Sequence, residues 1–220
     1  LGRLNHRNVL PIYDVFQTQN TVGLVLEYVP GGNIVDRLER DSRLSVNDAV
    51  GLMHGVLAGL QALHNVGIIH RDIKPENVLL AIEDGHTVPK ITDLGISYQE
   101  DGTRLTRDGS RLGTPEYMSP EQIKGGNTST ASDIYACGIM MYEMLVGTPP
   151  FVGADYDIQH GHVSGQPDMT KMPNGTPQWL QGIVLNALQK DPGRRYASAQ
   201  VFLEALRSGR ASGDGRLPSE

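Results

Sequence analysis

Apolar residues gather in two short runs near the start of the chain, with a polar stretch between them. The runs are Val9–Phe16 and Thr21–Tyr28, and Gln17–Asn20 separates them. Runs rich in β-branched and aromatic residues that are joined by a short polar turn are typical of an antiparallel hairpin. Pro30–Gly32 then breaks the chain. We therefore predict a β-hairpin followed by a turn.

The clearest helical pattern extends from Ser45 to about His64. Ser45 is a favourable N-cap, Asp48 three residues later completes a capping-box pattern, and Gly67 ends the helix. The apolar residues at helical spacing are Val46, Ala49, Val50, Met53, Val56, Leu57, Leu60 and Leu63.

The second half of the chain predicts three more helices. Ser132 to about Val146 is apolar on nearly every face, which indicates a buried core helix. Trp179–Gln189 and Ser198–Arg207 are amphipathic. Ile69 to about Pro120 is loop-like with short strand pieces, and its polar part, Asp101–Ser110, predicts a mobile loop. A little β followed by mostly α indicates a helix-rich α+β fold.

Composition narrows the class of protein. With 220 residues, 39% hydrophobic and 20% charged, the sequence is typical of one soluble globular domain or a large piece of one. A net charge of −6 gives no reason to expect nucleic-acid binding, and no apolar run is long enough to predict a membrane span. The single cysteine, Cys137, excludes a disulfide framework, so a cytoplasmic setting is expected.

Candidate chemistry is concentrated in His70–Asn77, which reads HRDIKPEN, and in Asp93 sixteen residues later. The carboxylate of Asp72 can accept a proton, and Lys74 can stabilise a transferring phosphoryl group. Asn77 and Asp93 offer hard oxygen ligands suited to Mg²⁺. Each residue type alone is more often a solvated surface group. Together they are the parts that phosphoryl transfer needs.

This spacing resembles the H-R-D-x-K-x-x-N and D-F-G signatures of protein kinases. Gly113–Glu121, which reads GTPEYMSPE, resembles the segment that closes a kinase activation loop. Asp133 and Gly138 resemble the D-x-x-x-x-G of the long buried helix, and Arg195 resembles the arginine that pairs with the P-E glutamate, Glu121.

The resemblance runs in order from about Leu1 to Arg207 and is strongest to the bacterial, eukaryotic-like Ser/Thr protein kinases. It implies an α+β protein-kinase-like fold that is mainly the helical large lobe. Residues 1–29 would end the small lobe, 30–208 would form the large lobe, and 209–220 would be a flexible tail. Lys74 and Thr114 stand where Ser/Thr kinases, rather than tyrosine kinases, carry them.

The resemblance implies ATP and Mg²⁺ as cofactors. Asp72 would be the catalytic base, and Lys74 would contact the γ-phosphate. Asn77 and Asp93 would hold Mg²⁺, and Thr114 would link to Asp72 and Lys74.

The resemblance also implies an adenine site at the hinge strand. The carbonyl of Glu27 and the N–H of Val29 would bond adenine, and Leu26 would be the gatekeeper. Leu79 would lie under the ring, and Asn33 would lie near the ribose. For the apolar positions, ordinary core packing is expected as well.

Several other positions would align or regulate the site. His70, Leu94 and Ile12 match three members of the hydrophobic stack of active kinases, although Leu94 replaces the usual phenylalanine. Arg71 beside Asp72 resembles kinases that are switched by activation-loop phosphorylation. The candidate phosphosites are Thr103, Thr106 and Ser110, with Thr106 favoured, and the alternative is that Arg71 pairs with a loop carboxylate such as Asp108.

The glycine-rich loop and the V-A-I-K lysine of the family do not precede the hinge in this chain, and Leu1–Asn8 resembles the end of the helix that carries the lysine's glutamate partner. We therefore expect both ends to continue in a longer protein. We expect the 220 residues alone to be inactive and, with an exposed hairpin edge, prone to aggregate.

Two other functions stay open. One is a pseudokinase scaffold, which the intact set of catalytic residues disfavours. The other is a small-molecule phosphotransferase of the aminoglycoside-kinase type. The GTPEYMSPE block of this chain disfavours that function, because enzymes of that type lack the block. As partners, the kinase reading implies protein substrates and possible self-association for autophosphorylation. It implies no nucleic acid, and a membrane only through segments outside this chain.

Overall fold

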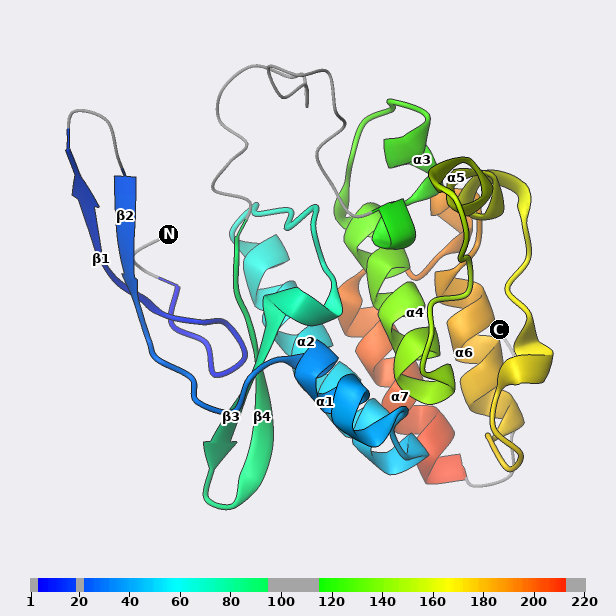
Figure 1. Cartoon of the computed structure of the whole chain (residues 1–220), viewed down its shortest axis with the longest axis horizontal. Helices are drawn as coiled ribbons and strands as arrows, with labels where there is room; N and C mark the ends of the chain where they lie inside the picture. Colours follow the sequence, from blue (N-terminus) through cyan, green and yellow to red (C-terminus); the bar gives the residue numbers. More distant parts are fainter. Residues whose placement is uncertain (1–3, 19–21, 95–114, 213–220) are drawn as a thin grey trace.

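The computed structural model describes residues 4–18, 22–94 and 115–212, with residues 210–212 described by their backbone alone. Two small antiparallel sheets accompany a larger helical body (Figure 1). The strands are β1 (Ile12–Gln17), β2 (Val22–Leu26), β3 (Val78–Glu83) and β4 (His86–Ile91). The helices are α1 (Ile34–Asp41), α2 (Val46–Asn65), α3 (Pro120–Ile123), α4 (Thr130–Val146), α5 (Asp155–Ser164), α6 (Gln178–Ala187) and α7 (Ala199–Ser212). The predicted helix-rich α+β fold is confirmed.

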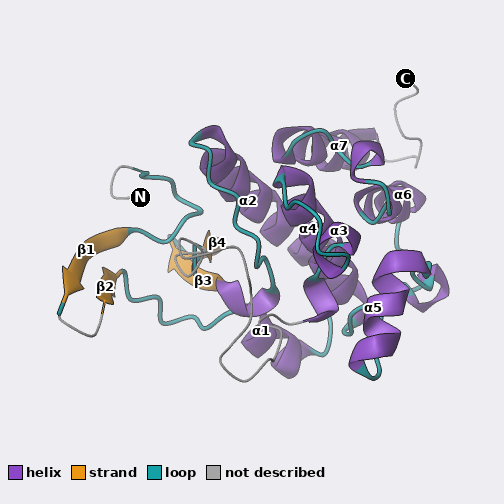
Figure 2. Ribbon diagram, turned by 90° about the horizontal axis from the view of Figure 1, so that it is seen from above, coloured by secondary structure: helices purple, strands orange, loops and turns teal. Residues whose placement is uncertain are grey.

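The predicted N-terminal hairpin is present, with shorter strands than expected. β1 and β2 pair antiparallel, with Ile12 opposite Leu26 and Gln17 opposite Val22. In Figures 1 and 2 the hairpin stands to one side of the helical body, with the β3–β4 ribbon between them. Six of its large apolar side chains are 37–66% exposed. They belong to Tyr13, Val15, Phe16, Val22, Val25 and Leu26. Among the described residues, β1 and β2 form a sheet only with each other, so the predicted unpaired edge is present, and aggregation stays a prediction.

The α2 helix begins as predicted. The Ser45 side chain accepts from the backbone N–H of Asp48, and the Ser45 hydroxyl donates to the Asp48 carboxylate at 2.9 Å. At the other end, Gly67 has a φ of +77°, a left-handed conformation that glycine adopts without strain.

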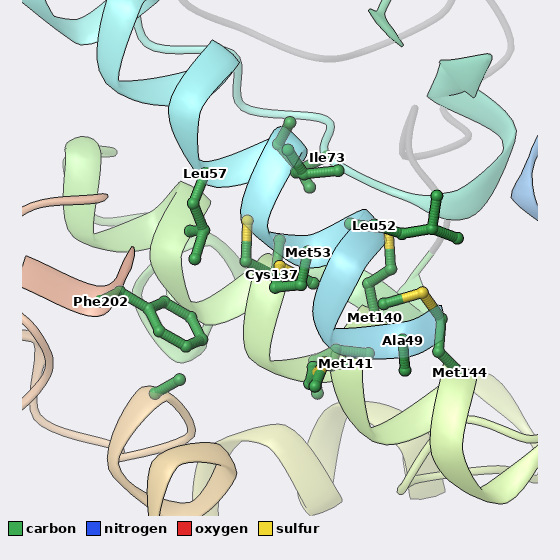
Figure 3. Close-up of a cluster of buried hydrophobic side chains, with 14 of the residues drawn as sticks. Ala49, Leu52, Met53, Leu57, Ile73, Cys137, Met140, Met141, Met144 and Phe202 are labelled. Carbon is green, nitrogen blue, oxygen red and sulfur yellow. The ribbon is translucent and has the colours of Figure 1, made fainter. Parts of the chain in front are cut away.

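The core lies where α2 packs against α4 and α7 and where α6 packs against α4, and it is rich in methionine (Figure 3). Thirteen of the 17 residues of α4 are buried, so the prediction of a core helix is confirmed. Burial raises the pKa of the Cys137 thiol well above its usual value, which leaves it protonated and unreactive. The residues in Figure 3 include Ala49, Leu52, Met53, Leu57, Ile73, Cys137, Met140, Met141, Met144 and Phe202.

A glycine lets α4 and α6 approach closely. A Cβ at Gly138 would stand 2.8 Å from the Cβ of Ala187 and 3.0 Å from a methyl of Leu188. Any side chain at this position would therefore push the two helices apart. This contact gives a packing reason for the D-x-x-x-x-G pattern.

Sequence reasoning missed α1 and α5 and saw β3 and β4 only as short strand pieces. α1 begins with a capping box in which Asn33 accepts from the N–H of Asp36 and the Asp36 carboxylate accepts from the N–H of Asn33. The turn between β3 and β4 is Asp84–Gly85, with φ values of +50° and +76°. An Asp-Gly pair with both φ values positive is a strong hairpin signal, which the pattern analysis did not use.

The other boundaries shift by a few residues. α6 ends at Ala187, short of the predicted Gln189, and α7 continues past Arg207 to Ser212, into the predicted tail. Within the described residues, no helix is both long enough and apolar enough to cross a bilayer.

Candidate functional site

Asp133 in the first turn of α4 holds the loop that joins α2 to β3. Its side chain is 1% exposed and accepts from the backbone N–H of His70 at 2.9 Å and of Arg71 at 2.7 Å. The ring of His64 lies 2.8 Å from the same carboxylate. Arg71 has a φ of +69°, a conformation that costs free energy for a residue with a side chain. The buried carboxylate compensates by bonding two successive N–H groups of this bend.

His70 ties the loop to the segment that carries Asp93. Its buried ring places Nε2 2.8 Å from the carbonyl of Thr92, while Nδ1 lies 3.3 Å from the N–H of Asp72. Because the N–H of Asp72 must donate, Nδ1 is the acceptor and Nε2–H donates to Thr92. Leu94 is 8% exposed. The stacking role of His70 stays a prediction, and the described contacts of its ring are polar.

Asp72, Lys74 and Asn77 lie together, as the spacing predicts. The Asn77 Nδ2 group donates to the carbonyl of Asp72 at 2.8 Å and to its Oδ2 at 3.1 Å. The ammonium of Lys74 lies 3.3 Å from the same Oδ2. The Asp72 side chain is 36% exposed, whereas Asn77 is 4% exposed. Asn77 and Lys74 therefore orient the carboxylate, and an acceptor hydroxyl can still reach it from solvent.

Asn77 and Asp93 fit the needs of a magnesium ion. The N–H of Thr92 donates to the Asn77 carbonyl at 2.9 Å, which brings the start of the Asp93 segment against Asn77. Because Nδ2 of Asn77 is used on Asp72, its Oδ1 is the atom left to act as a ligand. Mg²⁺ commonly takes one or two protein oxygens and completes its shell with phosphate and water. Asp93 is exposed and has a φ of +56°.

Of the residues predicted to contact the adenosine of ATP, only Leu26 lines the pocket that lies between the hairpin and the segment after β4. The N–H of Leu10 donates to the carbonyl of Ile91 at 2.8 Å, which brings the hairpin to the strand. Leu79 on β3 forms an isolated antiparallel bridge with Asn33. The pocket is lined by Leu10, Ile12, Leu24, Leu26, Thr92, Asp93 and Leu94. The structure thus brings the predicted gatekeeper, two members of the predicted stack and one predicted metal ligand to one hollow.

The hinge segment itself makes few contacts. The N–H of Glu27 donates to the carbonyl of Pro11 at 3.3 Å, and Val29 is partly buried. Gly31 cannot carry a side chain, because a Cβ there would overlap the carbonyl oxygen of Leu80. The side chain of Asn33 caps α1, so its placement near a ribose stays a prediction.

Glu121 and Arg195 form a buried, bidentate ion pair. Nη1 and Nη2 of Arg195 each donate at 2.8 Å to one oxygen of Glu121. Ser132 at the start of α4 also donates to Glu121, at 2.7 Å. Burial raises the pKa of Glu121, but the bonds from Arg195 and Ser132 lower it by more. The net pKa is below its usual value, so the carboxylate stays charged. The predicted pair therefore links Glu121, the last residue of the GTPEYMSPE segment, to Arg195 in the segment between α6 and α7.

The sequence analysis missed a second tie, between Tyr117 and Glu143. The Tyr117 hydroxyl donates to Glu143 at 2.6 Å. Burial raises the pKa of Glu143 to about 7, with further upward contributions from Glu76 and Glu116, although the Tyr117 bond lowers it. Glu143 is the only carboxylate in the apolar run IMMYEMLV of the core helix. A charged residue inside such a run was a usable signal.

Four predicted site residues lie outside the described residues. They are Thr103, Thr106, Ser110 and Thr114. Arg71 is partly buried, and its carbonyl accepts from Gln122 Nε2 at 3.1 Å. This bond joins the loop of Asp72 to α3 beneath the GTPEYMSPE segment.

Comparisons with known proteins agree with this geometry. Residues 1–205 match the protein kinase domain family. The chain is 34% identical over 209 residues to a serine/threonine-protein kinase of Corynebacterium efficiens, covering 92% of this chain and 39% of that protein. It is 35% identical to the kinase PrkC of Bacillus subtilis, covering 90% and 30%. It is 33% identical to PknL of Mycobacterium tuberculosis, covering 100% and 55%. The chain thus spans about a third to a half of the length of these relatives.

Proposed function

This chain belongs to the protein kinase domain family, and we propose that it supplies the catalytic residues of a Ser/Thr protein kinase. The reaction would transfer the γ-phosphate of ATP to serine and threonine hydroxyls of proteins. The observation that carries the proposal is the Asp72 carboxylate, held by Asn77 and Lys74 and still open to solvent. The relatives' printed names add support, since each is called a serine/threonine-protein kinase.

Each residue has a role that its geometry supports. Asp72 Oδ would orient the acceptor hydroxyl and take its proton as the oxygen attacks the γ-phosphorus of ATP, while the bond from that phosphorus to the departing oxygen of ADP breaks. Lys74 stands beside this oxygen and balances negative charge on the transferring phosphoryl group. Asn77 and Asp93 would hold Mg²⁺, which when bound supplies positive charge to the phosphates. His70 and Asp133 fix the backbone from which these groups project.

Incubation of the full-length protein with labelled ATP, Mg²⁺ and a general protein substrate tests the proposal. We expect the label on serine and threonine after phosphoamino-acid analysis, because Lys74 and Thr114 match the Ser/Thr class. Label confined to tyrosine would contradict that class. Nucleotide binding without any transfer would favour the pseudokinase scaffold instead.

We also propose that phosphorylation near Arg71 regulates the enzyme. A phosphate adds about −1.5 to −2 charge and would pair with the guanidinium beside Asp72. After incubation with ATP and Mg²⁺, mass spectrometry of the full-length protein should find phosphate on Thr106, with Thr103 and Ser110 as the other candidates. Absence of phosphate from all three residues would refute the switch.

The scope of the activity also remains a proposal. The 220 residues contain no glycine-rich loop before the hinge, so we expect transfer only when phosphate-positioning groups are supplied from outside them. Protein substrates, self-association for autophosphorylation and a cytoplasmic site of action follow from the kinase reading. Any membrane attachment would come through segments outside this chain.

A further inference from the structure

A buried lysine on β4 is not used by the chemistry described so far. Lys90 is 7% exposed, and its ammonium lies 3.1 Å from a carboxylate oxygen of Glu27 and 3.3 Å from one of Glu83. Burying an ammonium is costly unless it is paired and hydrogen-bonded. Two carboxylates from two different segments meet that need, so the fold provides a specific ion-pair site for this ammonium.

The register of the β3–β4 ribbon decides where this side chain points. Lys90 lies directly opposite Leu79, whereas Ile91 lies opposite Val78. Directly opposed residues share a face of a sheet, and successive residues alternate between faces. Val78 and Ile91 are both fully buried in the core. Lys90 therefore shares the other face with Leu79, the residue predicted to lie under the adenine ring.

Glu27, the other end of the pair, is the first residue after β2. Its own carbonyl is the group predicted to contact adenine. The two carboxylates around Lys90 are not equivalent, because Glu83 also accepts from Arg7 at 2.8 Å. For Glu27, Lys90 is the only salt-bridge partner among the described residues. Loss of Lys90 would leave Glu83 paired and would release Glu27.

The charge of Lys90 is secure at neutral pH. Burial alone lowers the pKa of its ammonium, but the hydrogen bonds to Glu27 and Glu83 raise it, and the net pKa is above the usual value. Arg7, and then Lys90, lower the pKa of Glu83.

We propose that Lys90 is a positioning residue for the nucleotide, because it fixes Glu27 and with it the direction of the hinge carbonyl. The inference rests on the proposed function, since it assigns the adenine of ATP to this site. Lys90 sets the hinge on the face of Leu79, so that the two adenine contacts keep a fixed spacing. It does not touch the acceptor protein, and its effect is confined to nucleotide affinity.

Lys90→Met in the full-length protein tests the inference, because methionine keeps an unbranched stem and removes the charge. We expect the KM for ATP to rise roughly tenfold, the scale of losing a hydrogen bond between charged groups, with the KM for a protein substrate unchanged. Lys90→Arg should restore much of the affinity. Lys190→Met is the matched control, because Lys190 is also partly buried. Its ammonium donates to the carbonyl of Gly161 on α5, so ATP affinity should not change.

Glu27→Gln is a second test of the same contact, and it leaves the buried side chain of Lys90 unchanged. Its side chain is 29% exposed, so the variant should fold, and the KM for ATP should rise in the same direction. Combined with Lys90→Met it should add little, because both changes break one contact. An unchanged or lower KM for ATP in Lys90→Met, or equal rises for ATP and protein substrate, would overturn the inference.

Direct nucleotide binding separates this inference from the proposed function. The dissociation constant of ATP can be measured by calorimetry in the Asp72→Asn background, where transfer is expected to be slowed by about 10²–10⁴-fold. If the protein transfers no phosphate but Lys90→Met still weakens ATP binding, the kinase proposal fails and the role of Lys90 stands. If transfer occurs and binding is indifferent to Lys90, the reverse holds.

Discussion

Asp72→Asn is expected to lower the rate of phosphoryl transfer by about 10²–10⁴-fold, the usual contribution of a general base. Asparagine has the same shape, and its side-chain oxygen can still accept from Nδ2 of Asn77, which now bonds Oδ2 at 3.1 Å. The backbone contacts of this residue to His70 and Asn77 remain. Only the ability to take a proton and the charge beside Lys74 are lost.

The measurement is the initial rate of phosphate transfer to a protein substrate, with ATP affinity and thermal stability determined on the same samples. Asp84→Asn is a matched control, because Asp84 lies in the β3–β4 turn with a φ of +50°, a conformation that asparagine also tolerates. This control should keep the wild-type rate. A rate in Asp72→Asn within a few-fold of wild type would show that Asp72 is not the base.

The local parts of this site could be predicted from sequence because they are close together in the chain. His70–Asn77 fit on one loop, and the spacing of Asp72, Lys74 and Asn77 already places them within reach of one another. The α2 helix was equally predictable, since its apolar face and its Ser45 cap are both local signals. Local patterns therefore identified the chemistry and its main supporting helix.

The contacts that hold the loop in place are not local, and periodicity does not show them. Asp133 reaches His70 across 63 positions, and Lys90 reaches Glu27 across 63 as well. Only resemblance to a family pointed to Asp133, and nothing pointed to Lys90. A lysine in a strand is normally read as solvent-facing, and its burial here depends on two carboxylates brought by other segments.

α5 shows a second reason for failure. Its sequence, DYDIQHGHVS, has a weak apolar pattern, and only Ile158, Gly161 and His162 are buried. Phe151 packs so closely on Gly161 that a Cβ there would stand 2.6 Å from its ring. His162 is buried with its pKa lowered to about 4, because burial disfavours its charged form. Tertiary packing, rather than local propensity, makes this segment a helix.

Arg195→Leu is expected to lower the free energy of unfolding by about 3–5 kcal/mol, the usual cost of breaking a buried ion pair from one side. The Arg195 side chain is 0% exposed. Besides its two bonds to Glu121, it donates to the carbonyls of Gln189 at 2.8 Å, Ala131 at 2.8 Å and Lys190 at 3.2 Å. Leucine fills part of the space but leaves these carbonyls and the Glu121 carboxylate without their donor.

Urea unfolding followed by the fluorescence of Trp179, the only tryptophan of the chain, measures this loss, since Trp179 is buried on α6. Arg194→Leu is the control. The side chain of Arg194 is 76% exposed, and its Nε lies as far as 3.9 Å from the Asp191 carboxylate. This substitution should therefore change the free energy of unfolding by less than about 0.5 kcal/mol. Arg195 joins Glu121 on α3 to the segment between α6 and α7, so its loss should also free the GTPEYMSPE segment. If Arg195→Leu unfolds at the same urea concentration as Arg194→Leu, the pair is not a structural tie.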